Sequence, residues 1–197
     1  MWRVRALPAG ARVLALAGTR VLVLAGAAVL ALAGGCGSGD DGPRMRAVPP
    51  RPPAAAAGGA CELLDYAVVE QVLGTRFEVS AAGRQNATYT CVLQPSKASL
   101  PDLTLAVTPT AADAAIFRST VTPRGGTAVT GLGKAAYRLP VAAAAKRGPG
   151  VEIGWLSSNN RLMMVTYTTP AGTAPAAAAE AGAKLLQLAQ KIDKASV

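Results

Sequence analysis

The pattern of apolar and polar residues from position 77 onward predicts a series of short β-strands. Apolar side chains alternate with polar ones at residues 77–79, 89–93 and 103–107, which is the spacing of a strand with one buried face. Residues 131–139 are expected to form a Gly turn that leads into a short strand. Two further strands are predicted at 151–155, where apolar residues again alternate, and at 162–169. The last two are separated by a turn at Asn159 and Asn160, so we expect them to form an antiparallel hairpin.

Apolar residues at helical spacing come before the first strand. Asp65 can cap a helix that ends at Gly74. Leu64, Val68 and Val72 are expected to lie on one face of this helix.

Two further helices are predicted. Residues 110–113 give a capping-box-like start before Ile116 and Phe117. Later, Thr173 and Pro175 open a long helix. Its apolar stripe consists of Ala181, Leu185, Leu188 and Ile192. Together the elements predict an α+β fold, in which an antiparallel sheet is packed with two or three helices.

The first 35 residues follow a different pattern. Four arginines and no acidic residue lie in the first 20 positions, and residues 21–33 are uncharged and dominated by Val, Leu and Ala. This is the layout of a secretory signal. A membrane-spanning helix needs about 20 apolar residues, and the uncharged run reaches only 15 even when it is counted to Gly35. A cleaved signal is therefore favoured over a permanent span.

Small residues lie directly before Cys36, in the segment Leu-Ala-Gly-Gly-Cys. This segment resembles the lipobox of bacterial lipoproteins. The resemblance implies that a diacylglyceryl group is attached to the Cys36 thiol and that a peptidase cuts after Gly35. The protein would then be held on the outer face of the cytoplasmic membrane, since two acyl chains give stable anchoring. The alternative is a plain cleaved signal followed by a coincidental cysteine.

The chain divides into a signal peptide at 1–35, a tether at 36–60 and an extracytoplasmic domain at 61–197. The tether is rich in Gly and Pro and has no apolar periodicity, so it is expected to be flexible at its Gly/Ser end and extended at its Pro end. Its Pro-rich tract also has the composition of a ligand for proline-recognition domains, although a spacer is the simpler interpretation.

Two cysteines remain if Cys36 carries lipid. Cys61 and Cys91 are 30 residues apart, and an even pair in an exported protein indicates a disulfide. Cys91 shares a face with its apolar neighbours on a predicted strand, so the bond would join the start of the first helix to the sheet. The alternative is two buried free thiols.

The net charge of +9 is divided unevenly along the chain. From residue 36 onward there are 16 Lys and Arg against 11 Asp and Glu, and from residue 61 onward the counts are 13 and 9. A small positive charge suits a surface that faces anionic lipid or wall polymers. Nucleic-acid binding would require clustered basic residues interleaved with aromatic ones, so we expect no nucleic-acid partner.

Several short motifs occur in an order that resembles a family of uncharacterised lipoprotein domains from actinobacteria. They are CELLDYAVVEQVLG at 61–74, the strand cysteine Cys91, VTGLGKAAYRL at 129–139 and a final helix rich in Ala and Leu. The resemblance covers about residues 61–192. That family has no established activity, so the resemblance implies an extracytoplasmic lipoprotein domain and assigns no catalytic residues.

The sequence contains no histidine, which removes the commonest general acid-base residue and metal ligand. With Cys36 acylated and Cys61 bonded to Cys91, no thiol would remain for a nucleophile or a zinc site. Ser-Lys catalysis needs neither residue type, but no Ser-x-x-Lys motif occurs. The GLGK segment at 131–134 has only part of a phosphate-binding loop, and a turn is the simpler interpretation. We therefore expect a protein that has no cofactor or metal and is not an enzyme.

Three aromatic side chains are the remaining candidates for ligand contact. Tyr137, Trp155 and Tyr167 fall on predicted strands that lie near one another in the sheet. Together with Met163 and Met164 they could line an apolar pocket for a lipid or a peptide. The alternative is that they belong to the core and the sheet surface.

These features predict a membrane-anchored extracytoplasmic lipoprotein that acts as a binding or accessory module of the cell envelope. Its partners would be membrane lipid at the acylated Cys36 and an unidentified envelope protein or small ligand. A second hypothesis is a carrier of a lipidic or small envelope ligand. A third is an enzyme that works without histidine.

Overall fold

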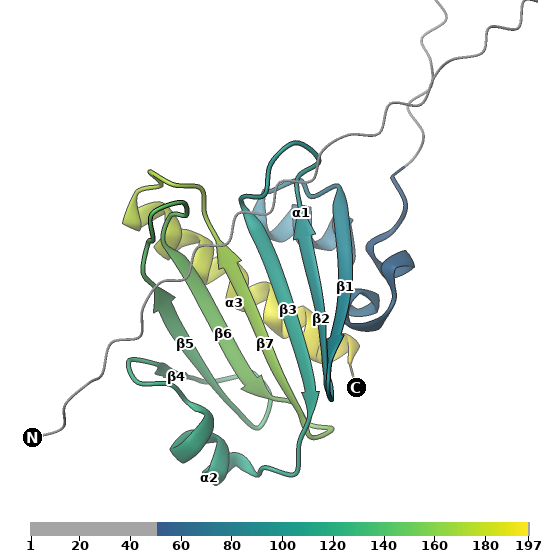
Figure 1. Ribbon diagram of the computed structural model, residues 1–197. Helices are drawn as coiled ribbons and strands as arrows, with labels where there is room; N and C mark the ends of the chain where they lie inside the picture. Colours follow the sequence, from purple (N-terminus) through teal and green to yellow (C-terminus); the bar gives the residue numbers. More distant parts are fainter. Residues whose placement is uncertain (1–50, 197) are drawn as a thin grey trace, which may run out of the picture. The chain divides into compact units, whose positions relative to one another are not determined.

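The computed structural model describes residues 51–196. They form a seven-stranded sheet with the strand order β1-β2-β3-β7-β6-β5-β4, in which all neighbouring strands are antiparallel. The strands are β1 (Val79–Gln85), β2 (Thr88–Gln94), β3 (Asp102–Pro109), β4 (Thr127–Val129), β5 (Ala135–Val141), β6 (Gly150–Leu156) and β7 (Arg161–Thr168). The helices α1 (Tyr66–Leu73) and α3 (Pro175–Ala195) lie together behind the sheet in Figure 1. The predicted α+β fold is confirmed.

The main core lies between the sheet and these two helices. Leu105, Val165 and Ile153 occupy one row across β3, β7 and β6, and each is fully buried. Leu185 and Leu188 of α3 belong to the same buried cluster. We call this side of the sheet the helix face and the opposite side the open face. Because side chains alternate along a strand, each strand residue is assigned to one of the two faces.

The predicted hairpin between β6 and β7 is confirmed. Asn160 has a φ of 58°, the left-handed conformation that Asn adopts more readily than most residues. Ser157 closes the turn, since its Oγ accepts a hydrogen bond from the Arg161 N–H at 3.0 Å. The turn residues therefore act as the sequence indicates.

The two helices behind the sheet begin where the sequence predicts. Asp65 caps α1, because its Oδ1 accepts hydrogen bonds from the N–H groups of Ala67 and Val68 at 2.6 and 3.1 Å. Gly74 ends this helix with a φ of 71°. Pro175 is the first residue of α3, a position where its missing N–H costs nothing.

The buried face of α1 differs from the predicted one. Its buried positions are Tyr66, Val69 and Leu73. Val68 and Val72 are only half-buried at the edge of the core, and Leu64 is buried but precedes the helix. In α3 the predicted stripe of Ala181, Leu185, Leu188 and Ile192 lies against the core, with Ala181 half-buried and the others buried.

The two edge strands differ from the sequence pattern. The alternation predicts a strand at 77–79, whereas β1 begins at Val79 and continues to Gln85 through small and polar residues. Phe77 is buried just before it. The three-residue strand β4 has no counterpart among the predicted strands. Both strands have one ladder partner and little burial, so neither needs an apolar face.

The short helix after β3 starts three residues later than predicted. Asp113, rather than Thr110, is the N-cap, and its Oδ1 accepts from the N–H groups two and three residues later at 2.9 and 2.8 Å. The helix α2 (Ala114–Ile116) runs directly into the π-helical turn η3 (Phe117–Val121). Phe117 is 1% exposed and forms a second, smaller core on the open face.

The ordered domain begins earlier than the predicted boundary at Cys61. The last part of the predicted tether forms two 3-10 turns, η1 (Ala54–Ala57) and η2 (Gly59–Leu63). Ala54 and Ala60 are 1% and 3% exposed and belong to the main core. Their small side chains let this segment pack closely on the domain, so it is not a free spacer.

Cys61 of η2 and Cys91 of β2 form a disulfide, as predicted. Their Cα atoms are 4.9 Å apart, and both side chains are 0% exposed. Cys91 lies opposite Leu105 on the helix face. The bond ties the segment before α1 to the second strand of the sheet, and the alternative of two free thiols is wrong.

We predict that the double variant Cys61→Ala, Cys91→Ala lowers the free energy of unfolding by about 3 to 4 kcal/mol, because the bond closes a loop of 30 residues. Urea denaturation followed by circular dichroism measures the loss. The wild type treated with reducing agent is the control and should lose a similar amount. A loss below about 1 kcal/mol in both samples would contradict the stabilising role.

Candidate functional site

The predicted lipid-attachment site lies outside the described residues. This applies to Cys36, to the cleavage point at Gly35, to the signal peptide at 1–35 and to the tether up to residue 50. Within the part of the chain that the structure describes, no helix combines the length and the apolar character needed to cross a membrane. The anchor stays a prediction from the sequence.

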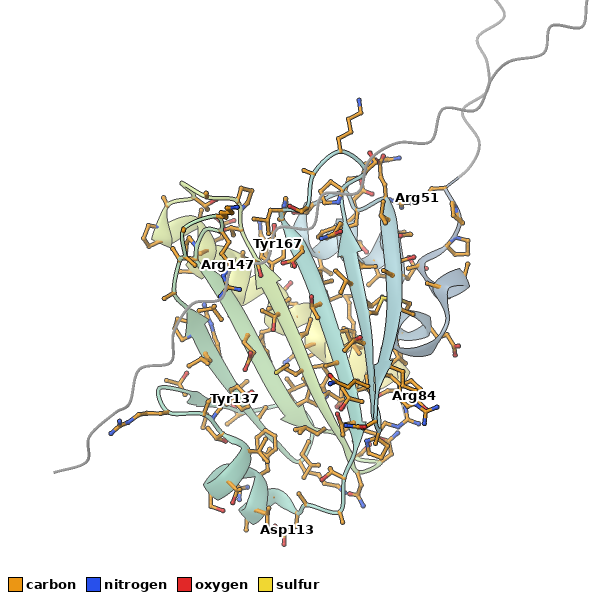
Figure 2. All side chains as sticks on the ribbon, in the orientation of Figure 1. Arg51, Arg84, Asp113, Tyr137, Arg147 and Tyr167 are labelled. Carbon is orange, nitrogen blue, oxygen red and sulfur yellow. A yellow bond between two sulfur atoms is a disulfide. The ribbon has the colours of Figure 1, made fainter. Side chains whose placement is uncertain are left out.

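The three aromatic candidates for ligand contact do not share one pocket. Trp155 and Tyr167 point to the helix face, where they are 0% and 8% exposed. Tyr137 pairs with Gly154, the residue before Trp155, and one step along a strand reverses the side of the sheet. Tyr137 therefore lies on the open face. Figure 2 shows Tyr137 toward the end of the sheet near Asp113 and Tyr167 toward the opposite end.

The two rings on the helix face are core residues whose polar atoms have partners. Trp155 Nε1 donates to Asp193 Oδ1 of α3 at 2.9 Å. Tyr167 Oη lies 3.0 Å from Thr75 Oγ1, within hydrogen-bond distance. These contacts connect α3 and the segment after α1 to the sheet.

Tyr137 is buried beneath η3. Its ring centre is 5.9 Å from that of Phe117, and its Oη donates to Glu152 Oε1 at 2.7 Å. Burial raises the pKa of Tyr137 above the usual range of a phenol, and the hydrogen bond and charge of Glu152 raise it further. The phenol is thus held as a protonated donor within the second core.

A hollow of about 310 Å³ lies between η2 and the sheet, and we call it the η2 hollow. Its lining includes the apolar side chains of Leu63, Tyr89, Val107 and Pro109 and the charged side chains of Glu62 and Arg161. The Arg84 guanidinium lies 4.9 Å from the centre of the Tyr89 ring. A second hollow of about 260 Å³ between α1 and α3 shares Leu63.

A larger hollow of about 460 Å³ surrounds the turn before β5, and we call it the β5 hollow. It is lined by Arg118, Thr122, Gly126 and residues 128–136. The GLGK segment forms a turn here, in which Gly131 and Gly133 have φ values of 77° and 53°. Leu132 between them is 3% exposed and belongs to the main core. The turn is therefore anchored by its own apolar residue.

Gly133 lets this turn lie directly against β6. The Lys134 N–H donates to the Leu156 carbonyl at 2.7 Å, and a Cβ at Gly133 would overlap the same carbonyl oxygen. The Lys134 Nζ donates to Asn160 Oδ1 at 2.5 Å. Both the backbone and the side chain of Lys134 are thus tied to the β6–β7 hairpin.

Geometry alone defines the candidate sites. No family model, curated protein or solved structure matches this chain. Among residues 51–196, no group of three or more Cys, Asp or Glu side chains is placed to hold a metal ion. Among the hollows of the described residues, two are candidate ligand sites: the mainly apolar η2 hollow and the β5 hollow, which carries two basic side chains.

The two hollows differ in how far the sequence indicates them. The η2 hollow combines residues from positions 59–63, 89, 107–109 and 161, which only the folded sheet brings together. The β5 hollow does have a sequence signal. Between Asp113 and Glu152 the chain has six Lys and Arg and no acidic residue, and a charge count over the whole domain hides this.

We predict that Gly133→Ala destabilises the domain by about 3 kcal/mol or more, because it combines a left-handed φ with overlap on a backbone carbonyl. Gly131→Ala is the matched control. Its φ of 77° is also left-handed, but the nearest atom is the end of the flexible Gln190 side chain at 3.9 Å. A loss of about 1 to 2 kcal/mol is expected there. Urea denaturation measures both, and equal losses would contradict the close contact.

Proposed function

We propose that this chain is a membrane-anchored lipoprotein on the outer face of the cytoplasmic membrane, where its domain is a non-enzymatic binding or accessory module of the cell envelope. The observation that carries the proposal is Cys36, which follows three small residues and an uncharged apolar run. Acylation of this thiol would make residues 1–35 a discarded signal and would supply the anchor.

The disulfide supports an extracytoplasmic location. Disulfides persist in oxidising compartments and are rare in the cytosol. The chain has three cysteines, and Cys61 is bonded to Cys91, so Cys36 is the one left for lipid attachment. The pairing agrees with the lipoprotein interpretation of the sequence.

The start of the domain suits attachment by a short tether. Fourteen residues separate Cys36 from Arg51, and a chain of that length spans at most about 50 Å. The turns η1 and η2 then pack on the domain, and the disulfide fixes η2 to β2. A partner bound by this domain would therefore lie close to the membrane.

The available side chains favour binding over catalysis. The chain has no histidine. Neither the η2 hollow nor the β5 hollow brings two carboxylates together, the arrangement that acid-base catalysis without histidine would use. Glu62 and Asp65 both line a hollow of about 450 Å³ beside η1, but Asp65 is engaged there as the cap of α1. The polar atoms beside the buried rings are occupied, since Glu152 accepts from Tyr137 and Asp193 accepts from Trp155.

We predict that Cys36→Ser abolishes incorporation of labelled palmitate in a bacterial host and moves the chain out of the membrane fraction, because the acyl groups attach through the thiol. Ser38→Ala is the control that keeps the thiol, and it should label and fractionate like the wild type. Cys36→Ser that still fractionates with membranes, or a wild type without label, would refute the anchor.

The η2 hollow favours a second candidate function, a carrier of a lipidic or small envelope ligand. Its volume of about 310 Å³ is at the lower end of small-molecule sites, which run from roughly 300 to 1,000 Å³. Leu63 and Val107 give it the apolar walls that such a ligand needs.

We predict that, if the domain is a carrier, the full chain purified from membranes shows a bound lipid in native mass spectra, and that Leu63→Arg removes it by placing a charge in the η2 hollow. Val79→Arg is the control, because Val79 is 43% exposed on β1 and does not line the hollow. A wild type without bound lipid would exclude the carrier and leave the anchor untouched.

A further inference from the structure

All the charged residues in the stretch between Asp113 and Glu152 are basic. Its six basic residues are Arg118, Arg124, Lys134, Arg138, Lys146 and Arg147, and it contains no acidic residue. Arg118 and Lys134 line the β5 hollow, and no carboxylate lines it. The fold therefore brings two of these cations to one concave site from different parts of the stretch.

The carboxylates of the neighbouring elements are already engaged. Asp113 caps α2, Glu152 accepts from Tyr137, and Asp193 accepts from Trp155. Within residues 51–196, the ion pairs with N–O distances up to 4.0 Å include neither Arg118 nor Lys134. In the described domain these two cations have no anionic partner.

Both cations are attached to backbone that the core holds in place. Phe117, directly before Arg118, is 1% exposed in the open-face core. Lys134 is fixed by its backbone bond to Leu156, and its ammonium gives one donor to Asn160. Two donors of that ammonium remain for a ligand. The backbone that carries each cation is therefore already ordered, so binding has to order only the exposed side chains.

The other residues that line the β5 hollow suit a small ligand that carries hydroxyl groups. Thr122 and Thr130 supply hydroxyl groups, and Ala128, Val129 and Ala136 supply small apolar walls. The volume of about 460 Å³ lies within the range of small-molecule sites. A ligand with one anionic group and several hydroxyls would match both the cations and the polar wall.

We infer that the β5 hollow binds the phosphate or carboxylate group of a sugar or polyol from the cell envelope. Arg118 presents paired N–H donors that match a phosphate or carboxylate, and Lys134 adds a compact positive charge. The envelope as the source of the ligand rests on the proposed function. The anion site rests on the hollow and its two cations.

The test is isothermal titration calorimetry on the chain from residue 36 onward, with Cys36 replaced as Cys36→Ser. This protein contains all the residues that the structure describes. The probes are a glycerol phosphate trimer, a trigalacturonate and the neutral maltotriose. We expect at least one anionic probe to bind about tenfold or more tightly than maltotriose, because only the anions pair with Arg118 and Lys134. Preference for the phosphate probe would identify a polyol phosphate ligand, and preference for the carboxylate probe a uronate ligand.

The double variant Arg118→Gln, Lys134→Gln should weaken that binding about tenfold or more. Lys146→Gln, Arg147→Gln is the matched control, since it removes the same charge from exposed positions, and Figure 2 shows Arg147 at the end of the sheet opposite Asp113. The control should bind like the wild type, and both variants should keep a wild-type melting temperature. Equal affinity for all three probes, or equal losses in both double variants, would overturn the inference. Palmitate labelling at Cys36 is independent of this result, so the two failures can be told apart.

Discussion

The register of β5 on β6 is the constraint on which the rest of the structure depends. It places Ala136 opposite Trp155 and Tyr137 opposite Gly154. Trp155 enters the main core and donates to Asp193 of α3, while Tyr137 faces the other way. A shift of β5 by one residue would turn Tyr137 to the helix face, away from Phe117 and Glu152.

The same register builds the second core and the β5 hollow. Gly154 leaves room for the Tyr137 ring, because a Cβ there would overlap it. The ring and its hydrogen bond to Glu152 give Phe117 a surface to pack on, and Phe117 fixes η3 on the open face. Arg118 is the next residue, so its position follows from the packing of a neighbour and from no contact of its own.

The sequence reveals those elements whose burial repeats along the chain, and it misses those that depend on distant partners. β3, β6, β7 and α3 each bury a regular set of apolar residues, and the Asp65 cap is a local contact, so all of them could be predicted. β1 and β4 lie at the edges, where one ladder partner imposes no apolar pattern. The disulfide could be predicted because Cys36 has another proposed role and the remaining pair is even. The η2 hollow could not, because its walls come from segments that are far apart in sequence. The β5 hollow is lined by one stretch, residues 118–136, but its shape depends on the packing of Phe117 and Leu132 in two different cores.

The β6–β7 turn shows how these distant segments are brought together. Asn160 accepts a hydrogen bond from Lys134 of the β5 hollow, and the adjacent Arg161 lines the η2 hollow. The two hollows therefore open beside the same hairpin. The turn is itself held by the end of α3, since Asn159 Nδ2 donates to the Ser196 carbonyl at 2.6 Å. Lys134 of the β5 hollow and Arg161 of the η2 hollow are therefore both attached to one short segment that is held by hydrogen bonds at each side.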